Sequence, residues 1–122
     1  MVLAQFFERG RGGEMKKVHV IPHGFYIYIV AKVEGETVLR AEQDRGHAQV
    51  ASNLYEEIGD RALVRVLGGG CLDFNPRIDD RKMWNEIHIS GGSGSFGREP
   101  DRELTVKLLQ ETFPNHKVVV QK

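Results

Sequence analysis

The pattern of apolar residues is clearest between residues 25 and 33, which read Phe-Tyr-Ile-Tyr-Ile-Val-Ala-Lys-Val. Aromatic and β-branched residues favour strands, and successive side chains of a strand point to opposite faces. Both faces of this segment are largely apolar, so we expect a central strand. Glu34-Gly35 follows as a two-residue turn, because Gly35 tolerates a positive φ, and residues 36–41 return as the partner strand.

Apolar residues recur at helical spacing in a later segment, residues 47–58. Val50 and Leu54 lie four positions apart there, so both fall on one stripe of a helix. Asp44 is a candidate cap for the start of this helix. Gly59 suits the position just after its end.

A second helix is predicted over residues 101–113, where Leu104, Leu108 and Leu109 form a buried stripe and Pro114 ends the helix. Shorter strands are expected at 2–7, 18–21, 61–67, 71–74, 84–89 and 118–120. The order of strands, helix, two strands, helix and strand predicts an α/β domain with two helices packed on a sheet. Residues 1–17 would form an N-terminal strand and connector, and residues 18–122 the domain.

Three consecutive glycines, Gly68 to Gly70, interrupt one of these strand patterns. Glycines inside a strand suggest a bulge, a bend or a place where another group must approach the backbone.

Composition limits the classes of function. A length of 122 residues fits one domain. The 17 Lys and Arg residues balance 17 Asp and Glu residues, which argues against duplex nucleic acid as a partner. No apolar run approaches the length of a membrane span, and the N-terminus lacks a signal-peptide pattern. A single cysteine, Cys71, allows no internal disulfide. We therefore expect a reducing compartment, the cytoplasm.

The first candidate site is the loop of residues 90–97, Ser-Gly-Gly-Ser-Gly-Ser-Phe-Gly, between a predicted strand and a predicted helix. Small residues in this position let backbone N–H groups converge on an anion without obstruction by Cβ atoms. The hydroxyls of Ser93 and Ser95 would add donors. The loop therefore predicts a phosphate site, and the alternative is a flexible surface loop without a ligand.

The second candidate is His47, at the predicted start of the first helix. A helix N-terminus carries partial positive charge and free N–H groups, both of which disfavour the imidazolium form. A neutral ring there is usable as a base or nucleophile, and the same helix start would attract a phosphate. The alternative is a histidine that only caps or packs the helix.

A metal site is not indicated. The other histidines do not form a ligand motif such as HExxH, and Cys71 has no CxxC partner. The chain also lacks the lysine-containing P-loop pattern and the GxSxG motif. We expect neither a metal nor a cofactor.

Four stretches together resemble the Janus/Ocnus family, whose best-known enzyme removes phosphate from phosphohistidine in proteins. They are the Gly24–Val33 strand, Gly46-His47-Ala48, Leu67-Gly68-Gly69-Gly70, and Ile87-His88-Ile89 running into the motif Gly-x-Ser-x-x-Phe-Gly at residues 91–97. The resemblance covers roughly residues 18 to 120. It implies a single mixed sheet of about six strands with two main helices. It also implies metal-independent hydrolysis of phosphohistidine in a protein or small molecule.

The resemblance also implies roles for particular residues. The family's catalytic histidine falls on His47, described as a base that activates water, although direct attack on phosphorus is also considered. The phosphate-binding loop of the family falls on Ser93, Gly94 and Ser95. If the chain is not an enzyme, the same loop would make it a binding module for a phosphorylated partner.

Two departures from the family pattern concern positive charge. The family carries a lysine at the position of Ile27 and an arginine at the position of Cys71, and both cations would help neutralise a phosphoryl group. Their absence favours the binding-module alternative. Arg45, Arg77 or Arg98 is a candidate replacement.

Overall fold

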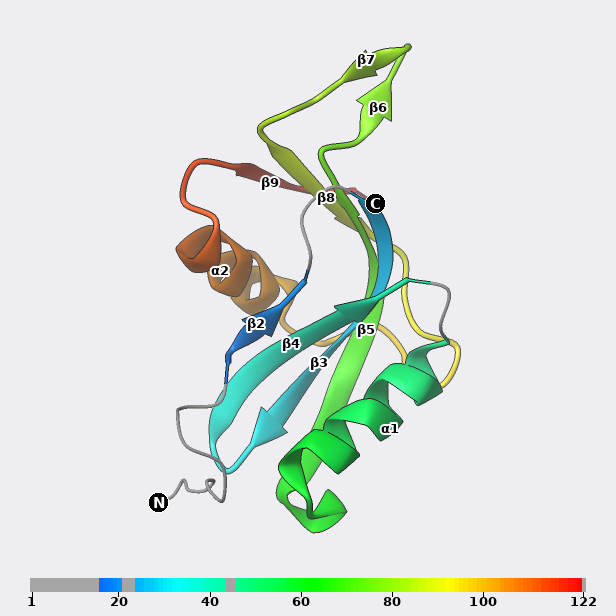
Figure 1. The fold of residues 1–122 in the computed structure, drawn as a ribbon, viewed down its shortest axis with the longest axis vertical. Coiled ribbons are helices and arrows are strands. Elements are labelled where there is room, and N and C mark those ends of the chain that lie inside the picture. Colours follow the sequence, from blue (N-terminus) through cyan, green and yellow to red (C-terminus); the bar gives the residue numbers. More distant parts are fainter. Residues whose placement is uncertain (1–15, 21–23, 44–45, 122) are drawn as a thin grey trace.

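The structure is a computed structural model that describes residues 16–20, 24–43 and 46–121 (Figure 1). Six strands form one mixed sheet in the order β2-β4-β3-β5-β8-β9. Their bounds are β2 Val18–His19, β3 Gly24–Val33, β4 Glu36–Glu42, β5 Val64–Phe74, β8 Glu86–Ser90 and β9 Lys117–Val120. The outer pairs β2–β4 and β8–β9 are parallel and the inner pairs are antiparallel. The predicted α/β fold with one mixed sheet is confirmed, whereas the strand expected at residues 2–7 lies outside the described residues.

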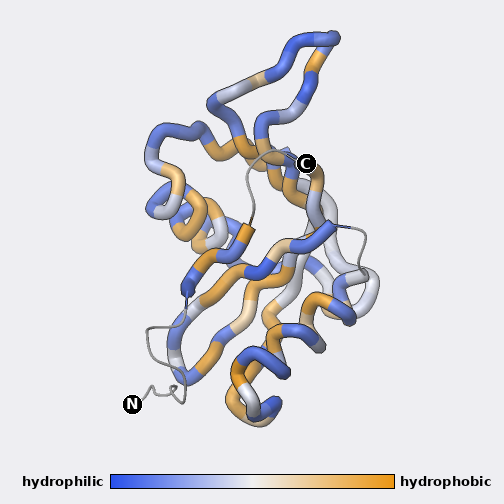
Figure 2. Tube along the Cα trace, viewed as in Figure 1, coloured by the Kyte–Doolittle hydropathy of each residue, from blue (hydrophilic) through white to orange (hydrophobic). Residues whose placement is uncertain are grey.

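Two helices cover opposite faces of the sheet (Figure 1). Helix α1, His47–Ile58, has the predicted bounds, and helix α2 spans Arg102–Thr112. Figure 2 shows hydrophobic residues recurring along both helices and the central strands. The α1 side of the core contains Ile29, Ala31, Val33, Val38, Val50, Ala51 and Leu54. On the α2 side lie Tyr26, Tyr28, Val30, Leu72, Phe74, Ile87, Ile89, Leu108 and Leu109, with further residues of β4.

Strand β3 is central, as its two apolar faces predict, and its odd and even residues feed the two halves of the core. Glu34 and Gly35 both have positive φ, 49° and 88°, which is the two-residue hairpin geometry that suits twisted strands. The N-cap of α1 is Gly46, so the prediction of an Asp44 cap is wrong, and Asp44 itself lies outside the described residues. Gly59 ends α1 in the left-handed conformation with φ of 87°, as expected.

The buried stripe of α2 differs from the prediction. It consists of Arg102, Thr105, Leu108 and Leu109, while Leu104 is only half-buried. A hydrophobicity pattern assigns a charged residue to the exposed side, but here Arg102 turns inward because Glu99 accepts a hydrogen bond from it there. Asp101 caps the helix by accepting a hydrogen bond from the Leu104 N–H.

Strand β5 runs without a break through the triple glycine, so the two strands predicted at 61–67 and 71–74 are one, preceded by a short 3₁₀ turn, Arg61–Leu63. Its register with β3 shifts between Val30 and Ala31, which is the irregularity that the glycines suggested.

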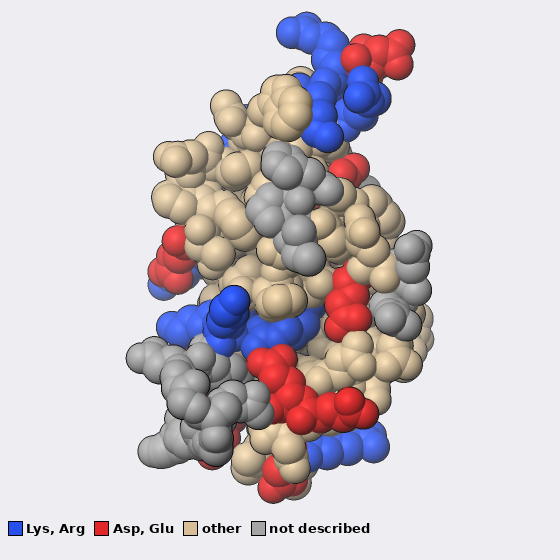
Figure 3. All heavy atoms as spheres, in the orientation of Figure 1, with Lys and Arg blue, Asp and Glu red and all other residues tan. Residues whose placement is uncertain are grey.

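The segment between β5 and β8 contains a small hairpin, β6 Arg77–Ile78 and β7 Arg81–Lys82. It projects beyond the sheet and is mostly hydrophilic (Figures 1 and 2). Its basic and acidic side chains gather together at the tip (Figure 3). In the described ranges no helix has the length and apolar character needed to cross a membrane.

Candidate functional site

The consecutive glycines of β5 make room for groups from distant parts of the chain. A Cβ atom at Gly69 would collide with the carbonyl oxygen of Tyr28 and lie 3.1 Å from Cδ2 of His47. A Cβ atom at Gly70 would lie 2.9 Å from Nη2 of Arg102. Because neighbouring residues of a strand point to opposite faces, His47 and Arg102 approach β5 from opposite sides of the sheet.

His47 is the first residue of α1, and its half-buried ring is fixed by one hydrogen bond. Its Nε2 lies 2.9 Å from the carbonyl oxygen of Gly70. A carbonyl only accepts, so Nε2 carries the proton, and the lone pair of a neutral ring is then on Nδ1. The N-cap residue is Gly46, so the N-cap position itself supplies no side chain to the first N–H groups of the helix.

Helix α1 is held firmly enough to place this ring. Its buried residues pack on β3 and β4 on one side of the sheet. Arg40 of β4 forms a bidentate pair with Glu57, with nitrogen–oxygen distances of 2.9 and 2.7 Å. Asn53 donates to both carboxylate oxygens of Glu42 at 2.9 Å. Both interactions join the middle and the end of the helix to the same strand, so they hold α1 against the sheet.

The glycine-rich loop lies beside His47 because it is bonded to the same stretch of β5. The Gly69 N–H donates to the carbonyl of Gly97 at 2.9 Å. Ser93 and Gly97 exchange backbone hydrogen bonds of 3.2 and 2.8 Å, which close the loop on itself. Phe96 packs against the α1 side of the core. The structure therefore brings together the two candidate sites that the sequence placed 46 positions apart, at His47 and Ser93.

The predicted phosphate-binding residues have different surroundings. Ser93 is buried, and its Oγ accepts hydrogen bonds from the N–H groups of Ser95 and Phe96 at 3.1 and 2.9 Å. Its own N–H donates to Gly97. Gly94 and Ser95 are exposed, and a Cβ atom at Gly94 would meet open space. Within the described part of the chain, neither the Gly94 N–H nor the Ser95 hydroxyl has a hydrogen-bond partner, so these are the donors of this group that are available to an anion.

A buried polar cluster beneath the loop was missed by the sequence analysis. Glu99 and Arg102 are 3% and 8% exposed, and their side chains are joined by a 2.7 Å hydrogen bond. The second oxygen of Glu99 accepts from Tyr28 at 2.6 Å and from Thr105 at 2.7 Å. The only signal in the sequence was the Glu-x-x-Arg spacing around the start of α2.

The cluster sets the ionisation of its members. Burial alone would raise the pKa of Glu99, but the hydrogen bonds from Arg102, Tyr28 and Thr105 outweigh it and hold that pKa below its usual range. Burial, together with the hydrogen bond to Glu99, raises the pKa of Tyr28. Glu99 is thus an anion and Tyr28 a neutral donor.

A family model, Janus/Ocnus family, matches residues 13–117, which is most of the chain. The chain belongs to the Janus/Ocnus family. Comparison with curated proteins gives no match.

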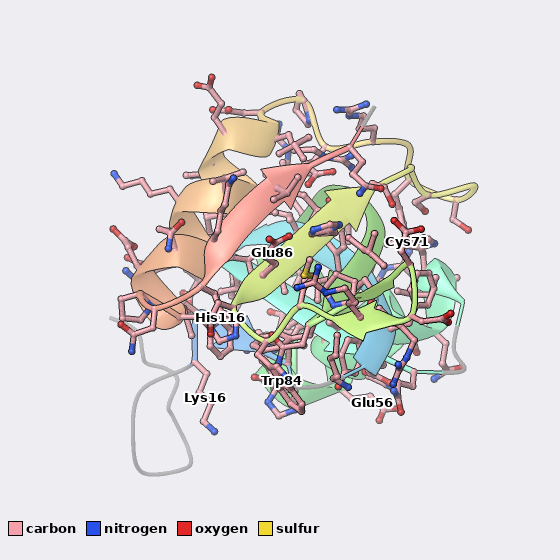
Figure 4. All side chains as sticks on the ribbon, turned by 90° about the horizontal axis from the view of Figure 1, so that it is seen from above. Lys16, Glu56, Cys71, Trp84, Glu86 and His116 are labelled. Atoms are coloured by element: carbon pink, nitrogen blue, oxygen red, sulfur yellow. The ribbon has the colours of Figure 1, made fainter. Side chains whose placement is uncertain are left out.

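This Janus/Ocnus chain has an apolar pair where the resemblance expects a lysine and an arginine. Ile27 and Cys71 are direct partners across β3 and β5, and both are half-buried. Cys71 lies two residues beyond Gly69, so it shares the face of β5 that His47 approaches. Figure 4 shows Cys71 on the side of the molecule away from α2.

The three arginines considered as replacements lie in different places. Arg45 is outside the described residues. Arg77 lies on the projecting hairpin, at the opposite end of β8 from the loop, and its Nη1 donates to the Asp80 carbonyl at 3.3 Å. Arg98 is exposed directly after the loop, with its backbone against Gly68 and Gly92.

Two further histidines of this Janus/Ocnus protein, His88 and His116, make other contacts. His88 lies between Glu86 and Gln121, at 2.7 Å from Glu86 Oε1 and 2.8 Å from the Gln121 amide nitrogen. His116 lies 3.1 Å from Oδ1 of Asn75. Across the described ranges, no group of three histidine, cysteine or carboxylate residues is close enough to hold a metal ion.

Proposed function

We propose that this protein is a phosphatase that hydrolyses phosphohistidine with His47 as its base and the loop of residues 90–97 as its phosphate site. The observation that carries the proposal is the hydrogen bond from His47 Nε2 to the carbonyl of Gly70. This bond uses one ring nitrogen and leaves the lone pair of Nδ1 for chemistry. Gly69, the residue next to that carbonyl, is hydrogen-bonded to the loop, so the base and the loop are both attached to the same stretch of β5.

The proposed reaction uses water and needs no other reactant. Nδ1 of His47 takes a proton from a water molecule as the water oxygen attacks phosphorus. The phosphorus–nitrogen bond breaks, and its electron pair remains on the nitrogen of the substrate imidazole. The proton held by His47 then passes to that nitrogen. Backbone N–H groups of the loop and the start of α1 would stabilise the negative charge on the phosphoryl oxygens.

A second candidate is a binding module that holds a phosphorylated partner without cleaving it. The Ile27–Cys71 pair favours it, because two apolar side chains stand where the family resemblance expects cations. Without those cations less positive charge surrounds the phosphoryl group, which slows transfer more than it weakens a contact made by backbone N–H groups.

The two candidates separate in one assay of the full chain. The protein is incubated with a phosphohistidine peptide, phosphate release is followed against the spontaneous rate, and binding of a stable phosphohistidine analogue is measured in parallel. We expect release that is proportional to enzyme and saturates with substrate. Binding of the analogue without release above the spontaneous rate would establish the binding module instead.

A further inference from the structure

One nitrogen of a buried arginine holds both ends of the phosphate loop. Arg102 Nη2 donates to the carbonyl of Gly91 at 2.9 Å, where the loop begins. It also donates to Oε1 of Glu99 at 2.7 Å, two residues after the loop ends. A third, longer contact of 3.3 Å reaches the carbonyl of Gly69 on β5. The backbone at Glu99 is itself packed on Gly68, where a Cβ atom would collide with it.

The carboxylate of Glu99 extends this connection to the central strand and to α2. It accepts from Tyr28 on β3 at 2.6 Å and from Thr105 on α2 at 2.7 Å. Through these bonds the loop is connected to Gly69. The next residue, Gly70, supplies the carbonyl group that accepts the hydrogen bond from His47. The positions of the base and the loop therefore depend on the same two residues of β5.

Stability does not explain the presence of this pair. Nε and Nη1 of Arg102 are buried, and within the described structure neither has a hydrogen-bond partner. Buried donors without partners oppose folding, and a buried ion pair can often be replaced by apolar residues of similar volume without loss of stability. The Glu99–Arg102 pair therefore lowers the stability of the fold, and it lies directly beneath the loop.

We propose that Glu99 and Arg102 are positioning residues that hold the phosphate loop in register with His47. The inference rests on the proposed function, because it takes this loop to be the phosphate-binding element. Neither residue touches the substrate in this account. They act by hydrogen bonding to the carbonyl groups of Gly91 and Gly69 and by fixing the direction that the backbone takes after Gly97.

The main test removes both charges together, so that no charge is left buried alone. In the double variant Glu99→Gln with Arg102→Met, glutamine keeps an acceptor for Tyr28 and Thr105, and methionine fills volume. We expect the melting temperature to stay within a few degrees of wild type. Amide hydrogen exchange at Ser95, Phe96 and Gly97 should accelerate at least tenfold, and the KM for a phosphohistidine peptide should rise at least fivefold with a smaller change in kcat.

A matched control breaks a second arginine–glutamate pair, in which Arg40 is buried and Glu57 is half-buried. Arg40→Met removes the bonds to Glu57 at the far end of α1 from His47. It should lower stability but leave exchange in the loop and KM near wild-type values. A purely structural role for Arg102 predicts the same pattern for both variants, with exchange rising across the molecule.

Rescue by lysine gives a further check. Because one nitrogen of Arg102 makes all three contacts, a lysine ammonium with its three donors suits the same acceptors, so Arg102→Lys should recover most of the lost KM and exchange protection. Unchanged exchange and unchanged KM in a folded double variant would overturn the proposal. If wild type shows no turnover but exchange in the loop still accelerates as expected, the proposed function fails while the positioning role stands.

Discussion

Replacing Gly69 with alanine places one methyl group at the point where β3, α1 and the loop meet. The new Cβ atom would collide with the carbonyl oxygen of Tyr28, which belongs to the backbone and cannot rotate away. It would also lie 3.1 Å from His47 Cδ2, which is tighter than an ordinary contact. Overpacking of this kind typically costs about 1–3 kcal/mol. At roughly 2.1 cal/mol/K of unfolding entropy per residue, that range corresponds to about 4–12 °C in melting temperature for a chain of this size.

The assay combines thermal unfolding with steady-state kinetics. A displaced ring should also lower kcat, since misplacing a catalytic group by about 1 Å costs roughly 10²-fold. Gly94→Ala is the control for stability, because a Cβ atom there meets open space, and it should be neutral or slightly stabilising. A Gly69→Ala protein with wild-type melting temperature and kcat would refute the close packing of His47 on β5.

Three further predictions concern the loop, metals and pH. Gly94→Val should raise KM for phosphohistidine at least several-fold, because it restricts the exposed N–H, with little change in melting temperature; unchanged kinetics would remove Gly94 from the phosphate site. Activity should survive excess EDTA, since the proposed reaction uses only His47, the loop and water; loss that zinc or magnesium restores would contradict this. The lowered pKa of Glu99 contributes stability above the ordinary carboxyl pKa, about 4.3. The free energy of unfolding should therefore stay nearly constant from pH 7 to 5 and decrease in more acidic solution. In the Glu99→Gln variant this decrease should be smaller.

The parts of the fold that were predicted are those that local patterns determine. Strand β3 and helix α1 each carry a complete periodic signal within a dozen residues, and Gly59 ends α1 for a local reason. The helix start at His47 was predicted because it is visible in that same pattern. The glycine-rich loop was found because its composition is unusual between a strand and a helix.

The parts that were missed depend on contacts between distant segments. Charged residues are usually exposed, so nothing in the periodicity of α2 places Arg102 inside; only the approach of Glu99 makes that burial tolerable. Each glycine of the triplet is required by a group far along the chain, which sequence spacing does not reveal. The bonds that Ser93 makes inside the loop depend on the loop's own conformation.

The central claim is that His47 is the base of a phosphohistidine phosphatase, and the most direct test is the kcat of His47→Ala on a phosphohistidine peptide. His116→Ala, which changes another half-buried histidine outside the site, is the matched control. We expect kcat of His47→Ala to fall by roughly 10² or more, the usual effect of losing a positioned base, with binding of a stable analogue much less affected. A folded His47→Ala protein with near-normal kcat would contradict the account.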